Sequence, residues 1–361
     1  MFKPLAVAAG ALAVLLTGCA GVSGQVTQPP TNDPTAPAET TPPTESKTLT
    51  VLTHDSFYLP EETLAAFAEA TGYEVVPVAP GDGGSLVNQL ILTKDAPLGD
   101  AVFGIDNTFA GRAIDAGVLA PYTSPALPEG AAALAEDGAG FLTPIDYGDV
   151  CLNADLGWFE AKGLAVPQTL DDLVKPEYAD LLVVSNPASS TPGLAFLIAT
   201  VAAKGDGYLD YWKQLKDNGV KVVPGWTEAY TVEFSGSAGK GPRPLVLSYA
   251  SSPASELGDD GKPRTGNLPQ TCLRQVEYAG VIAGAQNEVG ARKFVDWLLS
   301  PEVQAQIPAS MWMYPADPSA PLPDEWAQFG TSVEEPWHVP ATTIAADRET
   351  WIRDWTTTVI G

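Results

Sequence analysis

The sequence contains few of the residues that enzymes use most often for catalysis. Its 361 residues include only two histidines, His54 and His338, and three cysteines. It has neither a G-x-S-x-G turn nor an H-E-x-x-H motif, so the arrangements of common hydrolases and zinc proteases are missing. The segment SGSAGKG at 235–241 differs from a phosphate-binding loop because glycine stands where serine or threonine is required. We therefore predict neither catalytic residues nor a metal site, and keep a secreted hydrolase as the alternative class.

Basic residues are scarce as well. Lys and Arg together number 19 and Asp and Glu 44, which gives a formal net charge of −25 at pH 7. Such a charge disfavours nucleic acid and anionic lipid as partners and attracts cations at long range. The hydrophobic content of 45% is sufficient for a well-packed globular region.

Long apolar runs are absent except at the N-terminus. Lys3 precedes an apolar run from Leu5 to Leu16, which is too short to span a bilayer and is followed by the sequence LTGC. This sequence resembles the bacterial lipoprotein box, in which the cysteine is lipidated. We predict a signal peptide at residues 1–18 and a lipid anchor at Cys19 on the outer face of the cytoplasmic membrane. The alternative is an ordinary signal peptide.

Residues 19–46 form a second distinct segment. It contains six prolines between 29 and 43, among Thr, Gln, Ala and Ser, and has almost no apolar residues to bury. Such a composition predicts an extended spacer. The two remaining cysteines, Cys151 and Cys272, belong to an exported chain, in which paired thiols commonly oxidise. We predict a disulfide between them; two buried free thiols are the alternative.

The region after the spacer alternates between strand-like and helix-like segments. Strands are expected at 49–53, 73–79, 100–105, 144–153, 181–185, 245–248 and 273–283, and helices at 60–71, 85–93, 192–204, 208–218 and 288–299. This alternation predicts an α/β fold with a largely parallel sheet. The length favours two lobes, predicted at 47–146 plus about 275–361 and at 147–274, with two crossings that make a hinge.

Three short segments place aromatic residues beside Ser, Thr or Glu. They are GWTEAY at 225–230, LSYASSP at 247–253 and MWMYP at 311–315. Aromatic faces attract cations and stack on flat rings, so the segments suit a flat cationic ligand if they share a cleft. Each aromatic residue has burial in the core as its alternative.

These segments also carry a family resemblance. Together with THDSF (53–57), GDGGSL (81–86), IDN (105–107), IDYG (145–148) and SSTPGL (189–194), they resemble the thiamine-binding proteins of ABC importers. FVDWLLSPEVQ at 294–304 is shared more broadly among extracytoplasmic solute-binding proteins. The resemblance covers nearly everything after the spacer.

The resemblance implies a two-lobed periplasmic-binding-protein-like (type II) fold with hinge strands between the lobes. It further implies a monomer that closes on thiamine or a thiamine phosphate, requires no cofactor and delivers its ligand to ABC permease subunits. Iron-binding members are similar to one another in a Tyr-Tyr pair that this sequence lacks. A polyamine stays open as another cargo.

The aromatic segments supply the first ligand-binding candidates. By motif match, Trp226 and Tyr249 are similar to family residues that line the ligand, and Trp312 is expected to add another ring wall. Three residues follow Tyr249 in the matched loop and are expected to offer amides and hydroxyls: Ala250, Ser251 and Ser252.

Two further matched segments begin predicted helices. Ser190 and Thr191 precede a proline, which makes Thr191 the expected N-cap with free amides near it for oxygen-rich or phosphate groups. Capping of its own helix alone is the alternative. Asp82 and Gly83 match another binding pair, in a turn whose glycines permit close backbone approach.

Charged residues near strand ends complete the set. Asp55, Asp106 and Asp146 each follow a strand-like run, and one or two of them are expected to face the ligand's amine or thiazolium; turn or cap roles are the alternative. Tyr230 shares the segment of Trp226. His54 stands where the family often has tyrosine, and Ser255 also replaces an aromatic residue, so two possible ring walls are missing.

Overall fold

The structure is a computed structural model that describes residues 46–237, 240–330 and 332–361. The predicted signal peptide, the lipid anchor at Cys19 and nearly all of the predicted spacer lie outside these ranges. The chain divides into two units, Met1–Thr44, which lies outside the described residues, and Glu45–Gly361. Within the described ranges, none of the helices has both the length and the apolar character needed to cross a bilayer.

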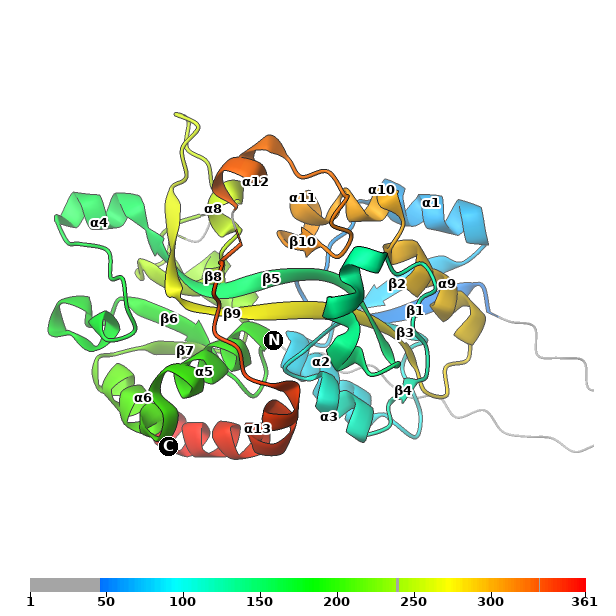
Figure 1. The fold of residues 1–361 in the computed structure, drawn as a ribbon, viewed down its shortest axis with the longest axis horizontal. Helices are drawn as coiled ribbons and strands as arrows, with labels where there is room; N and C mark the ends of the chain where they lie inside the picture. Colours follow the sequence, from blue (N-terminus) through cyan, green and yellow to red (C-terminus); the bar gives the residue numbers. More distant parts are fainter. Residues whose placement is uncertain (1–45, 238–239, 331) are drawn as a thin grey trace, which may run out of the picture. The chain divides into compact units, whose positions relative to one another are not determined.

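The second unit is built on one mixed sheet with helices packed against it (Figure 1). Its strand order is β2-β1-β3-β9-β5-β8-β6-β7, with β4 beside β9 and β10 beside β5. The strands are β1 (Thr48–Thr53), β2 (Glu74–Val78), β3 (Ala101–Asp106), β4 (Leu119–Ala120), β5 (Leu142–Asp155), β6 (Leu182–Ser185), β7 (Lys221–Val223), β8 (Leu245–Tyr249), β9 (Thr265–Ile282) and β10 (Tyr314–Pro315).

The helices largely follow the predicted alternation, which confirms the α/β class. They are α1 (Glu61–Thr71), α2 (Gly83–Leu92), α3 (Ala110–Asp115), α4 (Leu156–Lys162), α5 (Thr191–Lys204), α6 (Tyr208–Asp217), α7 (Trp226–Glu228), α8 (Ser252–Ser255), α9 (Glu288–Leu298), α10 (Pro301–Gln304), α11 (Ile307–Met311), α12 (Asp324–Phe329) and α13 (Ala341–Trp355). α10 and α11 are short helices that follow α9 closely.

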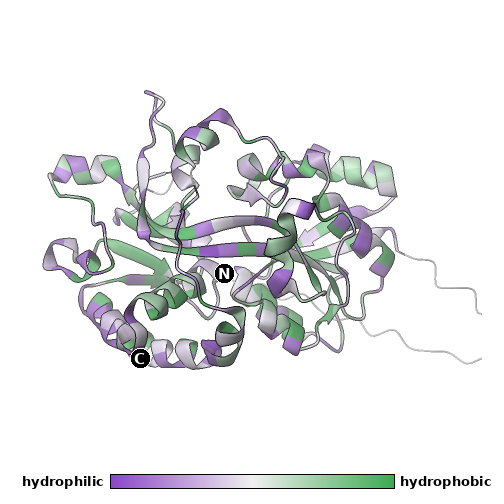
Figure 2. Ribbon diagram, in the orientation of Figure 1, coloured by the Kyte–Doolittle hydropathy of each residue, from purple (hydrophilic) through white to green (hydrophobic). Residues whose placement is uncertain are grey.

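Two long strands occupy the centre of the sheet. β5 and β9 pair antiparallel, from Leu142 opposite Gly280 to Asp155 opposite Thr265. On one side, β1 pairs parallel with β2 and β3; on the other, β6 pairs parallel with β7 and β8. Both predicted lobe boundaries fall within β5 and β9. Figure 2 shows hydrophilic positions along the middle of these two strands.

Two large hydrophobic clusters pack against the sheet, and the larger one includes residues from both groups of parallel strands. One includes Phe67, Phe103 and Phe294, and a larger one includes Phe109 and Trp212. Helices such as α9 contribute an apolar face to these clusters, whereas α5 is buried continuously from Thr191 to Thr200. The clusters hold the loops at the strand ends in place.

The start of α5 differs from the prediction. Ser190, not Thr191, is the N-cap, because its Oγ accepts a hydrogen bond from the Gly193 amide at 3.3 Å. Thr191 is the first helical residue, and Pro192 follows it. Proline tolerates any position in the first turn, so its presence alone does not identify the cap.

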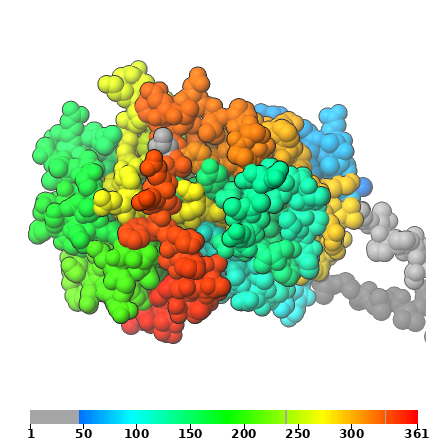
Figure 3. Space-filling view, in the orientation of Figure 1, coloured from blue at the N-terminus to red at the C-terminus, as the bar shows by residue number. Residues whose placement is uncertain are grey.

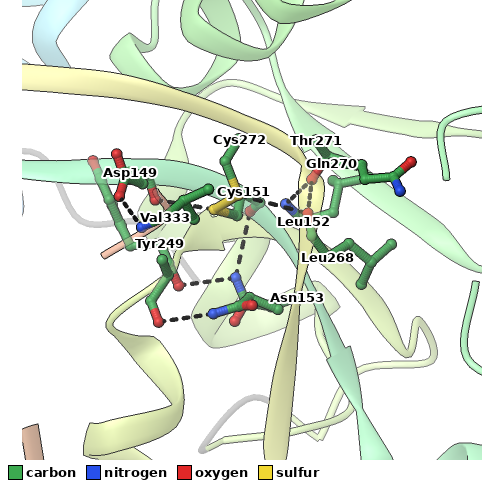
Figure 4. Close-up of a disulfide and its surroundings, with 12 residues drawn as sticks. Asp149, Cys151, Leu152, Asn153, Tyr249, Leu268, Gln270, Thr271, Cys272 and Val333 are labelled. Carbon is green, nitrogen blue, oxygen red and sulfur yellow. Dashed lines mark hydrogen bonds between the residues drawn. A yellow bond between two sulfur atoms is a disulfide. The ribbon is translucent and has the colours of Figure 1, made fainter. Parts of the chain in front are cut away.

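The predicted pair of cysteines is bonded (Figure 4). Cys151 of β5 and Cys272 of β9 form a disulfide with an S–S distance of 2.01 Å. Cys151 also lies opposite Ser248 of β8, so the bond lies next to the strand that carries Tyr249. The disulfide therefore joins the two central strands close to one of the predicted ring walls.

The C-terminal helix α13 packs against elements from both predicted lobes. Trp355 contacts Trp212 of α6 edge to face, with ring centroids 5.4 Å apart. Arg348 lies over the ring of Phe109, just before α3. Figure 3 shows the C-terminal segment on the surface between these two parts of the chain. The boundary prediction placed this whole segment in lobe 1, whereas Trp212 belongs to residues predicted for lobe 2.

Candidate functional site

A cavity of about 320 Å³ lies where the two groups of strands meet. The carboxyl ends of parallel strands are the usual place for ligands in open α/β sheets. The cavity is lined by His54, Asp55, Ser56, Asp82, Gly83, Thr191, Pro192, Trp226, Thr227, Tyr249, Glu277, Ser310, Met311, Trp312 and Met313.

The structure brings together eight of the predicted ligand-binding residues around this cavity. They are His54, Asp55, Asp82, Gly83, Thr191, Trp226, Tyr249 and Trp312. The other predicted residues are not among those that line it: Ser190, Tyr230, Ala250, Ser251, Ser252, Asp106 and Asp146.

Three aromatic side chains form the apolar part of the wall. The Trp226 ring centroid lies 6.2 Å from that of Trp312, with the planes at 88°, and 6.4 Å from that of Tyr249. The three residues are contributed by α7, the segment after α11 and the end of β8. They therefore share one cavity instead of separate positions in the core.

The residues behind this wall hold the rings in position. Tyr230 stacks on Trp226 with centroids 4.9 Å apart, and the Trp226 Nε1 donates to Ser248 Oγ at 3.0 Å. Ser252 Oγ lies 2.9 Å from Ser248 Oγ, and Ser251 Oγ donates to the Trp312 carbonyl at 2.6 Å. These side chains orient the aromatic wall from outside the cavity.

Asp82 joins three chain segments at one end of the cavity. Its Oδ1 accepts hydrogen bonds from the amides of Gly83 at 2.6 Å and Thr191 at 3.1 Å, and its Oδ2 accepts one from the Trp226 amide at 2.9 Å. Burial raises the pKa of the Asp82 carboxyl, although these hydrogen bonds and one from Ser190 favour the ionised form. The carboxylate thus connects α2 with the first turns of α5 and α7.

This arrangement corrects the prediction that the amides at the start of α5 are free. The Thr191 amide is bonded to Asp82, while the buried Thr191 Oγ1 has no hydrogen-bond partner among the described residues. Gly83 permits the close contact, because a Cβ at this position would lie 2.2 Å from Thr191 Oγ1. The hydroxyl of Thr191, unlike its amide, is therefore a polar group without a partner among the described residues, on a residue that lines the cavity.

The charged side chains that line the cavity are mostly acidic. Asp55 and Glu277 line it, and within the described part of the chain no Lys or Arg does so. His54 Nε2 lies 3.7 Å from Glu277 Oε2. Burial alone lowers the pKa of His54, but the carboxylates of Glu277, Asp82 and Asp55 raise it overall. The cavity therefore favours a positively charged ligand.

Two predicted aspartates are buried outside the cavity lining. Asp106 ends β3 and accepts hydrogen bonds from Thr108 Oγ1 and the Phe109 amide, so it stabilises the turn before α3. Burial raises the pKa of Asp106 to about 7. Asp146 lies inside β5 and does not follow a strand, which corrects the expectation for this residue, because β5 continues beyond it to Asp155.

Sequence reasoning missed several residues of the cavity, above all Glu277. It also missed Ser56, Pro192, Thr227, Ser310, Met311 and Met313. Glu277 had a detectable signal: it is a charged residue between Val276 and Tyr278 in a segment that is otherwise strand-like and apolar. A charge at such a position is rarely buried without a partner.

A second cavity, of about 710 Å³, lies between α3 and α13. Its charged lining residues include Arg112, Arg348 and Glu349, and Arg112 Nε lies 3.5 Å from a Glu349 oxygen. None of the predicted ligand-binding residues lines it. It differs from the aromatic cavity because arginines lie among its carboxylates.

Comparisons with known proteins agree with this geometry. The family model described as bacterial extracellular solute-binding protein matches residues 62–332. The chain is 31% identical over 320 residues to the thiamine-binding periplasmic protein of Brucella suis biovar 1 (strain 1330), covering 85% of this chain and 91% of that protein. It is 31% identical over 318 residues to the thiamine-binding periplasmic protein of Escherichia coli (strain K12), covering 85% and 92%.

A solved structure gives the same result for the fold. A periplasmic thiamin binding protein superposes with a TM-score of 0.75 and 29% sequence identity, covering 86% of this chain and 96% of that chain. The expected periplasmic-binding-protein fold is thereby confirmed. Proteins of this kind bind solutes outside the cytoplasm for transport and are not enzymes. The chain belongs to the bacterial extracellular solute-binding protein family.

Proposed function

We propose that this protein captures thiamine outside the cytoplasm and delivers it to an ABC permease. The observation that carries the proposal is the cavity in which Trp226, Tyr249 and Trp312 lie beside the acidic residues Asp55 and Glu277. Aromatic faces hold a cation with about 0.5 to 2 kcal/mol each, most strongly where water is excluded. The similarity to thiamine-binding periplasmic proteins supports this choice of cation.

The size and polarity of the cavity are compatible with this ligand. Small-molecule sites commonly measure about 300 to 1,000 Å³, are largely apolar and carry a few polar groups that fix orientation. Here the aromatic wall suits the aminopyrimidine and thiazolium rings, and the Thr191 hydroxyl suits the hydroxyethyl arm or its phosphate esters.

Capture proceeds by hinge closure in this proposal. Residues 47–146 plus about 275–361 form one lobe and 147–274 the other, with β5 and β9 as the connecting strands. The bonds from Thr191 and Trp226 to Asp82, and the Ser56–Thr227 hydroxyl contact at 3.2 Å, are then contacts between lobes. A ligand that touches both sides stabilises the closed state.

The proposal includes the position of the protein in the cell envelope. Lipidation of Cys19 anchors the chain to the outer face of the cytoplasmic membrane, and the spacer at 19–46 separates the folded part from the bilayer. The protein acts as a monomer, so each copy presents its closed form to the permease.

Ligand titration tests this function. Purified protein is titrated with thiamine, thiamine monophosphate, thiamine diphosphate and spermidine while tryptophan fluorescence is recorded, since Trp226 and Trp312 line the cavity. Saturable binding of thiamine or its phosphates, with no response to spermidine, is expected. Saturation by spermidine without a response to thiamine would replace the proposed cargo by a polyamine, and turnover of the phosphates would favour a hydrolase.

A further inference from the structure

Glu277 lies between two other carboxyl groups on neighbouring strands. In the sheet register it is opposite Asp106 of β3 on one side and Asp146 of β5 on the other. Like charges directly opposite one another destabilise a sheet. Three adjacent ionised carboxylates with little access to water would therefore be unfavourable, so protons must be distributed among them.

Of the three, Glu277 is the one that lines the cavity, and it also has a hydrogen-bond donor. Gln275 Nε2 donates to Glu277 Oε1 at 2.9 Å, and His54 Nε2 lies 3.7 Å from its Oε2. Gln275 is itself oriented by Tyr249, whose hydroxyl lies 3.2 Å from the Gln275 Oε1. These contacts hold the Glu277 carboxyl group in place beside the cavity.

Asp146 has the opposite surroundings. Its side chain is fully buried, and within the described ranges neither carboxyl oxygen has a hydrogen-bond partner. Burial, followed by the charge of Glu277, raises the pKa of Asp146 well above its usual range. Two facing carboxyl groups can hydrogen bond only if one carries a proton, and the more buried group holds it at lower cost.

We propose that Glu277 is the specificity-determining carboxylate that binds the positively charged part of the ligand, with Asp146 as a positioning residue that remains neutral and donates a hydrogen bond to Glu277. The inference rests on the proposed function, because it assigns a role within the same cavity. It goes beyond that function because it names Glu277 as the anion that binds the ligand and Asp146 as the residue that donates a hydrogen bond to Glu277.

Asp146 stays neutral because few like charges can be buried together beside the cavity. The titratable groups that face Glu277 are His54 from the loop after β1, Asp106 of β3, Asp146 of β5 and Tyr249 of β8. Burial raises the pKa of Tyr249 well above its usual range, so its hydroxyl stays neutral. With Asp146 neutral, Glu277 carries the one negative charge of this facing pair, which a bound cation can neutralise.

Two isosteric variants test the proposal. Glu277→Gln removes the charge with little change in shape and is expected to weaken thiamine binding by about 30-fold or more, as for the loss of one partner of a desolvated charge pair. Asp146→Asn keeps a hydrogen-bond donor beside Glu277 and is expected to change affinity by less than about threefold. Affinities are measured by calorimetry near pH 7, with thermal unfolding as the folding control.

A second measurement reads the Asp146 proton directly and does not depend on a ligand. The infrared difference spectrum between the wild type and Asp146→Asn is expected to contain the carbonyl band of a protonated carboxylic acid at neutral pH. A purely structural role for Asp146 would not produce this band.

If Glu277→Gln fails to fold, Glu277→Asp provides a second test. This variant keeps the charge on a shorter side chain, so it is expected to bind more weakly than the wild type but to retain selectivity for cations.

Several outcomes overturn the inference. Unchanged thiamine affinity in Glu277→Gln would show that Glu277 does not select the ligand. A loss of affinity in Asp146→Asn as large as that in Glu277→Gln would show that Asp146 is ionised, and so would absence of the acid band. Failure of the proposed function gives a different result, because the wild type itself would then not bind thiamine. The same variants are then compared with spermidine, for which the charge argument is identical.

Discussion

Asp82 accepts a hydrogen bond at 2.9 Å from the backbone amide of Trp226, which is 144 residues further along the chain. The same carboxylate accepts a hydrogen bond from Thr191, 109 residues away. One acidic side chain at the start of α2 is therefore bonded to the two segments that supply much of the opposite side of the cavity. These hydrogen bonds form only when the start of α2 lies close to the starts of α5 and α7.

Replacement of Asp82 is expected to weaken closure. In Asp82→Asn one oxygen acceptor becomes an NH2 group that faces an amide donor, so at least one inter-segment bond is lost. Loss of a charged acceptor from buried donors costs about 1.5 to 3 kcal/mol, which predicts ligand binding about 10- to 100-fold weaker. Calorimetry measures the affinity, and small-angle scattering with and without ligand measures the closure.

The exposed residue Asp95 offers a matched control for Asp82. Asp95→Asn makes the same chemical change away from the cavity and is expected to leave affinity and scattering unchanged. If Asp82→Asn behaved like this control, the Asp82 bonds would have no role in closure.

Trp312 combines a functional ring with an unusual backbone. Its φ is 58°, in the left-handed region that bulky residues rarely adopt. Trp312→Gly is expected to weaken thiamine binding by about 3- to 30-fold, since one aromatic wall is lost. It is expected to destabilise the fold less than Trp312→Ala, because glycine adopts positive φ without strain.

Calorimetry and thermal unfolding separate these two effects. Trp337→Ala is the control, because Trp337 is 37% exposed and does not line the cavity. Equal stability of Trp312→Gly and Trp312→Ala would show that the backbone of residue 312 relaxes, and unchanged affinity in both would remove Trp312 from ligand binding.

Stability is expected to fall as pH rises from about 4 to about 7, the window between the ordinary pKa of an aspartate and the raised value of Asp106. In this window the folded state holds a proton on Asp106 that the unfolded chain has released. Stability from this group is complete below the unfolded pKa and is lost as pH passes through the folded pKa. The raised pKa of His54 acts in the same direction at higher pH.

Denaturant unfolding at a series of pH values measures this effect. Asp106→Asn cannot titrate and is expected to flatten the curve, by an amount on the order of 1 to 4 kcal/mol across the window. A wild-type curve that rises between these pH values, with no change in the variant, would contradict a protonated Asp106.

The disulfide is expected to contribute to stability and not to ligand binding. The closed loop spans a sequence separation of 121 residues, so its loss is expected to cost about 2 to 5 kcal/mol. Cys151→Ala with Cys272→Ala, or reduction of the wild type, should lower the unfolding temperature. Thiamine affinity should stay within about threefold, since the cysteines do not line the cavity. A large loss of affinity at unchanged stability would instead assign the bond a role in positioning Tyr249.

Much of the architecture could be predicted because it depends on local pattern. α1 follows Pro60, carries Glu61 and Glu62 in its first turn and ends at Gly72 with φ 78°, as the sequence indicates. The extension of β5 at both ends and the earlier start of β9 could not be predicted, because their polar positions are satisfied by partners on neighbouring strands. Whether Ser190 or Thr191 caps α5 depends on which side chain turns towards the helix, and the local sequence does not decide between them.

The sequence by itself determined the α/β class, the pair of cysteines and the aromatic segments, since side-chain periodicity, turn residues and residue type are properties of neighbouring positions. Only the tertiary structure decided that Asp82 bonds the amides of distant helices and that Glu277 lies between Asp106 and Asp146. These relationships depend on strand register and on the approach of segments more than a hundred residues apart, and no local pattern encodes either of them.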